Sequence, residues 1–312
     1  MPVKTYLVTG ASGFIGCALV TGLRRRGHAV RRAGRNPRRN DTDIQLALPA
    51  NMASWQAALD RVDGVFHLAW STVPGSADHA PLTDLNTNVA GTIALLEALK
   101  SRPHIPLVTV SSGGTVYGTP DFTPISESHP LRPKGVYGAS KVAAEHYALA
   151  YQRQFDLDVR IMRLSNPFGP GQNVNGQLGA ATVFAWKALR QEEITIWGDG
   201  SVVRDFIYID DTVDALIAMM GAPRQALAQC GSVLNIGSGK GVSLRHIVGT
   251  IECALDRRVK VRYQPARRFD VPTNVLDVSL AESVLGWRPR TAFADGMARL
   301  LDAFADTTSP QH

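Results

Sequence analysis

The sequence predicts an α/β protein in which a doubly wound parallel sheet is joined to a second, smaller α/β lobe. Short segments that are apolar throughout alternate with helical patterns over the first 166 residues, which is typical of a parallel sheet covered on both faces. A glycine-rich turn also joins the first of these segments to the first helical pattern. The length of 312 residues leaves room for a second lobe, because single cores stop growing near ~250–300 residues.

The predicted elements follow one another in a regular order up to residue 166. Strands are expected at 6–8, 29–30, 65–69, 107–110 and 159–164, with helices at 14–23, 87–99 and 141–150. The turn cluster at 168–171 ends this order, and the later segments are shorter and more mixed. We therefore expect a first domain over residues 1–166 and a second lobe mainly over 167–312. The strand-like segment near 233–237 can return to the first sheet.

Composition excludes several classes of protein. The chain is 45% hydrophobic and 19% charged, as globular proteins are, and it contains no uncharged apolar run near the ~18 residues of a membrane helix. The first residues lack the pattern of a secretory signal, so we expect a cytoplasmic protein without a membrane partner. The three cysteines, which we expect to be buried thiols, are too far apart to suggest a disulfide framework or a zinc site: Cys17, Cys230 and Cys253.

The net charge of +6 is concentrated rather than spread over the chain. Much of the excess lies in the arginine-rich stretch between residues 24 and 39. Because the charge is local, it does not predict a nucleic-acid partner. Two interpretations remain for this stretch, a solvated helix end with its loop or a site for a phosphate.

A glycine-rich turn near the N-terminus predicts a dinucleotide site. Gly10, Gly13 and Gly16 form a G-x-x-G-x-x-G pattern directly after a strand and at the start of a helix. Such glycines allow a tight turn and a close approach of the backbone to a pyrophosphate, and the helix N-terminus offers free N–H groups. The alternative is an ordinary glycine-rich connection. The residues expected along the dinucleotide here are Gly10, Ser12, Gly13, Phe14, Ile15 and Gly16.

The end of the second predicted strand bears on which dinucleotide binds. In NAD-binding versions of this turn, an acidic residue there accepts hydrogen bonds from the adenosine ribose. Gly34 occupies about that place, and no acid lies near it. Arg35 is our first candidate to bind a 2′-phosphate and Arg32 the second, so both NAD and NADP remain open as the cofactor.

Tyr137 and Lys141 form the candidate catalytic pair. They stand four residues apart, so a helix places them on one face. An ammonium beside a phenol favours the phenolate and lowers a pKa that is ~10 when unperturbed, which suits proton transfer near neutral pH. A surface helix pair is the alternative interpretation. The position after a dinucleotide turn, and after a strand that ends at Ser111 and Ser112, favours catalysis.

Seven motifs together carry a family resemblance over nearly the whole chain. They are TGASGFIG at 9–16, HLAW at 67–70, NVAGT at 88–92, SSGGTVYG at 111–118, YGASK at 137–141, RLSNPFGPG at 163–171 and VRDFIYIDD at 203–211. In these motifs the chain resembles the extended short-chain dehydrogenase/reductases, within the NAD-dependent epimerase/dehydratase family typified by UDP-galactose 4-epimerase. The resemblance implies a Rossmann domain, a nucleotide-diphosphate sugar as substrate, and a homodimer formed through two helices of the first lobe.

The resemblance also implies roles for individual residues. Tyr137 would be the acid/base, and Lys141 would orient the nicotinamide ribose and lower the pKa of the tyrosine. Asn166 would face the substrate, while Arg204 and Arg267 would hold the diphosphate and Asp270 would lie near the nucleoside ribose. The residues implied along the cofactor, besides the glycine-rich turn and Arg35, are Leu68, Ala69, Asn88, Val110, Ser111, Tyr137, Lys141 and Pro167.

The chain departs from the family pattern at the catalytic hydroxyl. The serine or threonine that hydrogen-bonds the C4 oxygen of the sugar is replaced by Gly113. Ser112, Thr115 or a water molecule would then have to supply that group. The Asp-Glu pair of the family's dehydratases is absent as well, because Gly114 and Thr115 occupy its positions.

These observations rank the possible functions. A nucleotide-sugar 4-epimerase, acting by transient oxidation of C4, comes first, narrowly ahead of an NADPH-dependent reductase of 4-keto sugars. A dehydratase ranks lower because its acidic pair is missing. A non-catalytic dinucleotide sensor is the alternative from another class, and it is disfavoured because such proteins usually lose the tyrosine and the lysine.

Three other features receive structural interpretations. His67 is expected to be a satisfied structural histidine beside the cofactor, and Trp197 to be either a buried strand aromatic or a residue that stacks on a base. Asp210 and Asp211 are expected to cap a helix N-terminus. Adjacent carboxylates on one element diverge, so no metal site is predicted.

Overall fold

A seven-stranded parallel sheet forms the centre of the first lobe. The computed structural model describes residues 2–35, 43–175, 179–266 and 271–308. In sheet order the strands are β10 (Val233–Ile236), β6 (Val159–Leu164), β5 (Leu107–Ser112), β4 (Gly64–His67), β1 (Thr5–Thr9), β2 (Ala29–Gly34) and β3 (Asp43–Gln45). The predicted doubly wound α/β fold is therefore confirmed. The division of the chain at residue 166 stays a prediction.

The strand order places a crevice between β1 and β4. From β1 the chain moves outward to β2 and β3, and it then returns to β4 on the other side of β1 and continues to β5 and β6. At such a reversal the loops after the two neighbouring strands diverge, and ligands of open α/β sheets bind at the carboxyl ends of those strands. The glycine-rich turn follows β1, and residues 68–70 follow β4.

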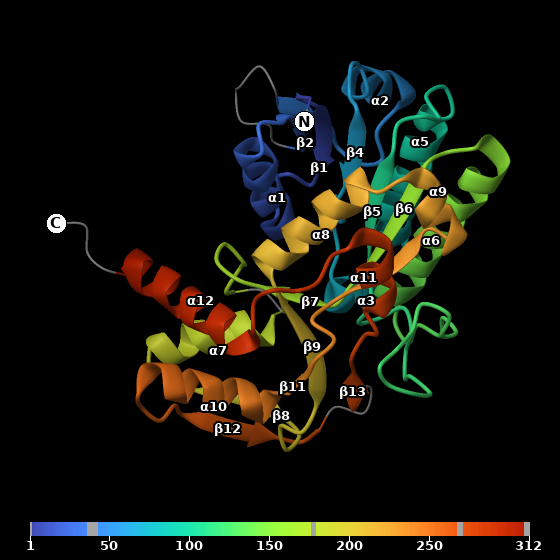
Figure 1. Cartoon of the computed structure of the whole chain (residues 1–312). Helices are drawn as coiled ribbons and strands as arrows, with labels where there is room; N and C mark the ends of the chain where they lie inside the picture. The colour runs from blue at the N-terminus through green and yellow to red at the C-terminus, as the bar shows by residue number, and fades with distance from the viewer. Residues whose placement is uncertain (1, 36–42, 176–178, 267–270, 309–312) are drawn as a thin grey trace.

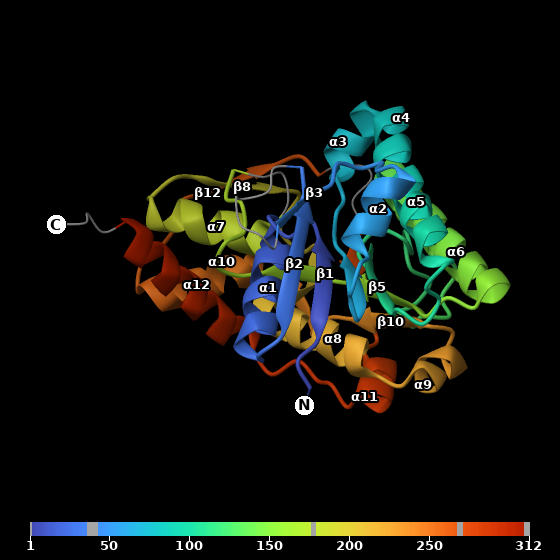
Figure 2. The same ribbon diagram turned by 90° about the horizontal axis from the view of Figure 1, so that it is seen from above.

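Helices cover both faces of the sheet (Figures 1 and 2). Tyr6 and Val8 of β1 enter one core, and Leu7 enters the other, because side chains alternate along a strand. The first core is closed by α1 (Phe14–Arg25), α8 (Ile209–Gly221) and α11 (Ser279–Leu285). The second is closed by α2 (Met52–Ala58), α5 (Ala90–Leu99) and α6 (Val136–Phe155). Burial on both faces explains why these strands are apolar throughout.

The second lobe has its own apolar core beside the sheet (Figure 1). Phe168, Phe206 and Met297 are among its buried members. Its elements are β7 (Asn166–Phe168), α7 (Ala180–Leu189), β8 (Ile194–Trp197), β9 (Val203–Tyr208), β11 (Gly241–Ser243), α10 (Leu244–Leu255), β12 (Val261–Gln264), β13 (Thr273–Asn274) and α12 (Phe293–Thr308). Strand β9 joins β7, β11 and β13 into one sheet, so the lobe is assembled around β9.

Short helices fill the remaining connections. They are α3 (Pro74–His79), α4 (Pro81–Asp84), a π-helical turn η1 (Leu85–Val89) and α9 (Arg224–Gln229). The helix expected at 87–99 thus begins with a π-helical turn. Within the described residues, no helix is long and apolar enough to cross a membrane.

Two expectations were wrong. Cys17 and Cys253 are exposed, because they lie on helix faces that point away from the cores, and Cys230, at the end of α9, is only partly buried against the first core. The expected cap at Asp210 and Asp211 is also wrong, because α8 begins at Ile209 and both carboxylates lie in its first turn. Asp211 instead accepts the backbone N–H groups of residues 290 and 291, at 3.0 and 2.9 Å.

A buried polar network joins α6 to the sheet. Arg163 on β6 pairs with Glu145 on α6 at 2.8 Å, and both side chains are buried. Arg163 also donates to the Tyr117 hydroxyl at 3.0 Å, and that hydroxyl donates to Asn235 on β10 at 2.6 Å. Because α6 carries Tyr137 and Lys141, this network holds the candidate catalytic helix against β6 and β10.

Replacing Glu145 should test the weight of this network. Glu145→Ala leaves Arg163 buried without its carboxylate, so the free energy of unfolding should fall by about 3–5 kcal/mol in urea denaturation. Glu192→Ala is the control, because its 2.6 Å pair with Arg190 is exposed and such pairs contribute about 0–1 kcal/mol. Equal losses in the two variants would show that burial of the pair does not matter.

Candidate active site

The glycine-rich turn is held in place by direct contact between backbones. A Cβ on Gly16 would lie 2.1 Å from the Gly10 carbonyl oxygen, and a Cβ on Gly10 would lie 2.7 Å from the Ala69 nitrogen. Gly10 also has a φ of +66°, which favours glycine. The turn after β1 therefore packs directly on Leu68 and Ala69 after β4, across the crevice of the sheet.

The start of α1 is open to an anion. Ser12 and Gly13 are exposed at this end, and the first turn of the helix contains no acidic residue. Free N–H groups and the partial positive charge of the helix N-terminus favour a phosphate at this position. Phe14 and Ile15 pack partly against the core of the second lobe, so the helix also ties the two lobes together.

The two arginines proposed for a 2′-phosphate differ in their surroundings. Arg32 on β2 is mostly buried and forms an ion pair with Asp43 on β3 at 3.6 Å. Arg35 is exposed just beyond the end of β2, next to Gly34, whose missing Cβ faces open space. Of the two side chains, Arg35 is therefore the one whose charge faces solvent near this strand end.

Tyr137 and Lys141 lie one turn apart on α6, as their spacing predicts. The Lys141 Nζ donates to the Val110 carbonyl at 2.9 Å and lies 5.7 Å from the centre of the Tyr137 ring. Burial raises the pKa of Tyr137, and the negative charge of Asp84 raises it further, so the lowered pKa expected from the sequence is wrong for the chain alone. Burial lowers the pKa of Lys141 to about 7, against the opposing charges of Glu145 and Asp84. The lysine can therefore change its charge near neutral pH.

The loop after β4 covers this pair. Trp70 places its ring centre 3.5 Å from the Lys141 Nζ and meets the Tyr137 ring edge to face, with the ring centres 6.1 Å apart. His67 has a threonine hydroxyl at each ring nitrogen, and burial lowers its pKa to about 3. It is thus a neutral structural histidine, as interpreted from the sequence.

Asn88 holds this loop in place through side-chain hydrogen bonds to Ser71 and Thr72. Its amide oxygen accepts the Ser71 N–H at 2.8 Å, and its amide nitrogen donates to Thr72 at 3.0 Å and to Asp84 at 2.8 Å. The side chain of Asn88 is fully buried, and both of its polar atoms have partners in the chain. A contact between Asn88 and a cofactor stays a prediction.

The loop after β5 explains the glycine at the position of the catalytic hydroxyl. A Cβ on Gly113 would lie 2.6 Å from a methyl carbon of Leu276, so that side chain fills the space a serine would need. Ser112 is partly exposed. The Thr115 hydroxyl is buried without a hydrogen-bond partner. The backbone of Thr115 also packs on the start of α6, because a Cβ on Gly138 would lie only 2.9 Å from the Thr115 carbonyl oxygen.

The second lobe brings two predicted substrate residues to the same strand. Asn166 donates to the Asp205 carbonyl on β9 at 2.8 Å. Arg204 itself lies on β9 and donates to the Val271 carbonyl at 2.7 Å. Val271 directly follows the segment 267–270. Arg267 and Asp270 belong to that segment and lie outside the described residues.

The residues present fit a dinucleotide and a polar substrate. Within the described ranges, some buried polar atoms without hydrogen-bond partners lie in the apolar cores, such as Trp55 Nε1 and Trp287 Nε1. Six others belong to α4 and to the loops and strands around Tyr137 and Lys141. A bound molecule with hydroxyl and amide groups would satisfy such atoms. They are Trp70 Nε1, Asp84 Oδ2, Ser111 Oγ, Thr115 Oγ1, Ser165 Oγ and Asn274 Oδ1. Val110 borders this region through its bond to Lys141. Pro167 lies on β7, and its contact with a cofactor stays a prediction.

Sequence reasoning missed Trp70, Asp84 and Glu145. Trp70 directly follows Leu68 and Ala69, which were expected along the cofactor, so its place in the HLAW motif was an available signal. Nothing in the sequence pointed to Asp84 or Glu145. No group of three or more potential metal ligands occurs among the described residues.

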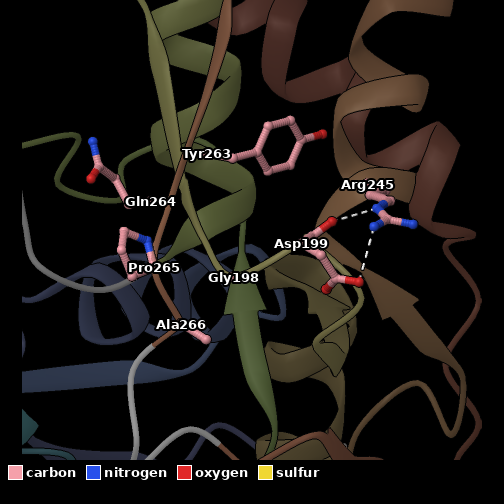
Figure 3. A pocket seen from close by; sticks show the side chains of 7 residues that line it. All are labelled: Gly198, Asp199, Arg245, Tyr263, Gln264, Pro265 and Ala266. Carbon is pink, nitrogen blue, oxygen red and sulfur yellow. Dashed lines mark hydrogen bonds and ion pairs between the residues drawn. The ribbon is translucent and has the colours of Figure 1, made fainter.

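A separate hollow of about 510 Å³ lies on the second lobe (Figure 3). Asp199 and Arg245 pair with each other across it at 3.0 Å, so its charges are already satisfied. Tyr263 and Gln264 point to opposite sides of β12 in this view.

Trp197, at the end of β8, is 40% exposed and so is not the buried strand aromatic that the sequence allowed.

Comparisons with known proteins agree with this geometry. The model of the NAD dependent epimerase/dehydratase family matches residues 6–237. The chain is 35% identical to a UDP-glucose 4-epimerase of Mycolicibacterium smegmatis, over 96% of this chain and 97% of that protein. It is 29% identical to a dTDP-4-dehydro-6-deoxyglucose reductase of Escherichia coli, over 95% and 96% of the two chains.

A solved structure is similar over nearly the full length. The UDP-glucose 4-epimerase of Thermus thermophilus, in complex with NAD, superposes with a TM-score of 0.86 at 28% identity. The match covers 96% of this chain and 99% of that one.

Replacing a glycine of the turn should abolish dinucleotide binding. In Gly16→Ala the new methyl group would lie 2.1 Å from the Gly10 oxygen, so the turn must open. We expect NAD affinity, measured by calorimetry, to fall at least tenfold. Gly249→Ala is the control: this exposed helical glycine has open space around it, and alanine there should raise the free energy of unfolding by roughly 0.5–1 kcal/mol without changing affinity. Unchanged NAD binding in Gly16→Ala would contradict the assignment of the turn.

Proposed function

Because the chain belongs to the NAD-dependent epimerase/dehydratase family of extended short-chain dehydrogenase/reductases, we propose that it is a nucleotide-sugar 4-epimerase. The observation that carries the proposal is that the loop after β4 contacts the glycine-rich turn through Leu68 and Ala69, and contacts both Tyr137 and Lys141 through Trp70. Similarity to UDP-glucose 4-epimerases over nearly the whole chain supports a UDP-hexose as the substrate.

Tyr137 carries the proton transfer in this proposal. A bound nicotinamide supplies an acceptor for the hydride that leaves C4 of the sugar, and a donor when it returns. Tyr137 takes the proton of the C4 hydroxyl as that carbon is oxidised and gives it back when the opposite face is reduced. In the chain alone, burial and Asp84 favour the neutral phenol. A nearby Lys141 ammonium opposes this and stabilises the phenolate that proton transfer requires.

Thr115 is the stronger candidate for the hydroxyl that Gly113 lacks. Its Oγ1 is buried without a partner, and its backbone touches α6 at Gly138, next to Tyr137. A buried hydroxyl without a partner is costly, so a sugar oxygen bound there would restore the lost hydrogen bond. Ser112, which is partly exposed, is the second candidate.

The second lobe would hold the nucleotide end of the substrate. Arg204 is fixed by the Val271 carbonyl beside the segment that contains Arg267 and Asp270. Two arginines can grip a diphosphate through paired, charge-assisted hydrogen bonds. We assign Arg204 and Arg267 to the diphosphate, Asp270 to the nucleoside ribose and Asn166 to the sugar.

A reductase of 4-keto sugars is the second candidate function. Gly34 offers no carboxylate to an adenosine ribose, and Arg35 is exposed beside it, an arrangement that favours NADPH. The likeness to a dTDP-4-dehydro-6-deoxyglucose reductase supports this alternative. In that reaction Tyr137 would donate its proton to the new C4 hydroxyl and be restored from solvent.

A homodimer is part of the proposal. The exposed side of α6 carries Tyr147 and Phe155, which are 45% and 37% exposed, and Leu85 of η1 is 46% exposed. Apolar groups on two neighbouring helices suit a two-fold helical interface. The cytoplasmic location also stays a prediction.

Removal of the Tyr137 hydroxyl tests the function directly. Tyr137→Phe should slow the conversion of UDP-galactose to UDP-glucose by roughly 10²–10⁴-fold, the usual contribution of general acid–base catalysis, while NAD affinity stays nearly unchanged. Tyr263→Phe, which alters an exposed tyrosine of the second lobe, should turn over normally. Wild-type rates in Tyr137→Phe would remove Tyr137 from the mechanism. Reduction of a 4-keto sugar with NADPH, without epimerisation by the wild type, would establish the reductase instead.

Arg35 decides between the two dinucleotides. If its guanidinium pairs with a 2′-phosphate, the wild type should bind NADP more tightly than NAD, the preference should weaken at high salt, and Arg35→Ala should abolish most of it. Arg25→Ala, at the exposed end of α1, is the matched control and should leave the preference intact. Titration of both dinucleotides measures this. Equal or tighter binding of NAD by the wild type would exclude a phosphate site at Arg35.

A further inference from the structure

Trp70 is in close contact with Lys141, and the proposed function gives this tryptophan no role. The loop after β4 brings the face of its indole ring to 3.5 Å from the Lys141 Nζ, measured to the ring centre. The same ring contacts Tyr137 edge to face. The ammonium is thus placed between the Val110 carbonyl, at 2.9 Å, and an aromatic face.

The loop that carries Trp70 is firmly held. Ser71 donates both its backbone N–H and its hydroxyl to the Asn88 side chain, at 2.8 and 3.1 Å. Thr72 donates to the buried Asp84 and accepts from Asn88. These bonds begin at the residue directly after Trp70, so the position of the indole is set by a buried network and not by chance packing of a surface loop.

We propose that Trp70 is a positioning residue for the catalytic pair, in which the face of its indole ring binds the Lys141 ammonium and keeps it charged beside Tyr137. The electron-rich face of an aromatic ring attracts a cation, most strongly when both are shielded from water. Lys141 is buried, so this attraction offsets part of its loss of hydration. The role presupposes the proton transfer proposed for Tyr137, but the contact itself does not depend on it.

Other ionisable groups around Lys141 also affect its pKa. Glu145, one turn further along α6, favours the ammonium but is paired with Arg163 of β6. Asp84 of α4 favours it as well, while the buried His67 of β4 is neutral. Together with the burial of Lys141, these groups leave its pKa at about 7. A loss of the aromatic face should therefore leave the lysine mostly neutral at physiological pH.

Two substitutions separate the aromatic face from the bulk of the side chain. Trp70→Leu keeps an apolar side chain and removes the ring, whereas Trp70→Phe keeps an aromatic face. The indole Nε1 has no hydrogen-bond partner among the described residues, so phenylalanine breaks no internal bond. Trp70→Met, which is also apolar and non-aromatic, replaces the leucine variant if that variant does not fold.

The decisive measurement is a pH titration of Lys141 in the purified full chain, without cofactor or substrate. The chain has seven lysines, so ¹³Cε labelling of lysine gives a simple spectrum, in which Lys141→Arg identifies the signal that is lost. In Trp70→Leu the midpoint should move about one pH unit below that of the wild type, and in Trp70→Phe it should stay close to it. Trp197→Leu, in the second lobe, should leave the midpoint unchanged.

Turnover supplies the second reading. In Trp70→Leu, kcat should fall increasingly behind the wild type between pH 6 and pH 8, about tenfold at the upper end, because fewer molecules carry the ammonium. An unchanged or higher midpoint in Trp70→Leu, or an equal shift in Trp70→Phe, would overturn the proposal. If the midpoint shifts as expected but the wild type turns over no nucleotide sugar, the contact stands and the proposed function fails.

Discussion

The close approach of two backbone segments at the carboxyl edge of the central sheet is the constraint on which the rest of this structure depends. The turn after β1 meets residues 68 and 69 after β4 at distances that leave no room for a Cβ on Gly10, and within the turn a Cβ on Gly16 would clash with the Gly10 carbonyl oxygen. This contact fixes the N-terminal end of α1 against the loop that continues to Trp70. The glycine-rich turn and the aromatic cover of Lys141 are thus parts of one packed unit.

A chain of buried charges extends from this unit into α6 and β6. Lys141 lies beneath Trp70, Glu145 follows it by one turn, and Glu145 is paired with the buried Arg163. Asp84 adds a second buried carboxylate, held by Asn88 and Thr72. Isolated charges of this kind would be expensive to bury, and the ion pair between Glu145 and Arg163 offsets that cost for two of them. The same arrangement lets the lysine titrate near neutral pH, where proton transfer is useful.

The replacement of the usual catalytic hydroxyl by Gly113 also follows from packing. Leu276, from the segment after β13, occupies the space of the missing side chain, and Asn274 donates to the Gly113 carbonyl at 3.2 Å. The second lobe therefore shapes the catalytic loop of the first. The sequence showed the departure at position 113 but not its cause, because Leu276 lies far along the chain. The unpaired Thr115 hydroxyl became the better candidate only when its burial was seen.

Sequence alone was enough to predict the doubly wound sheet, the glycine-rich turn and the common face of Tyr137 and Lys141. These features depend on local rules: continuous apolar strands, the conformational freedom of glycine, and the period of a helix. Tertiary packing was needed to show that Trp70 covers Lys141, that Arg32 is paired with Asp43 while Arg35 faces solvent, and that two of the cysteines are exposed and the third only partly buried. Each of these depends on side chains from different elements meeting in space, and no local period encodes such a meeting.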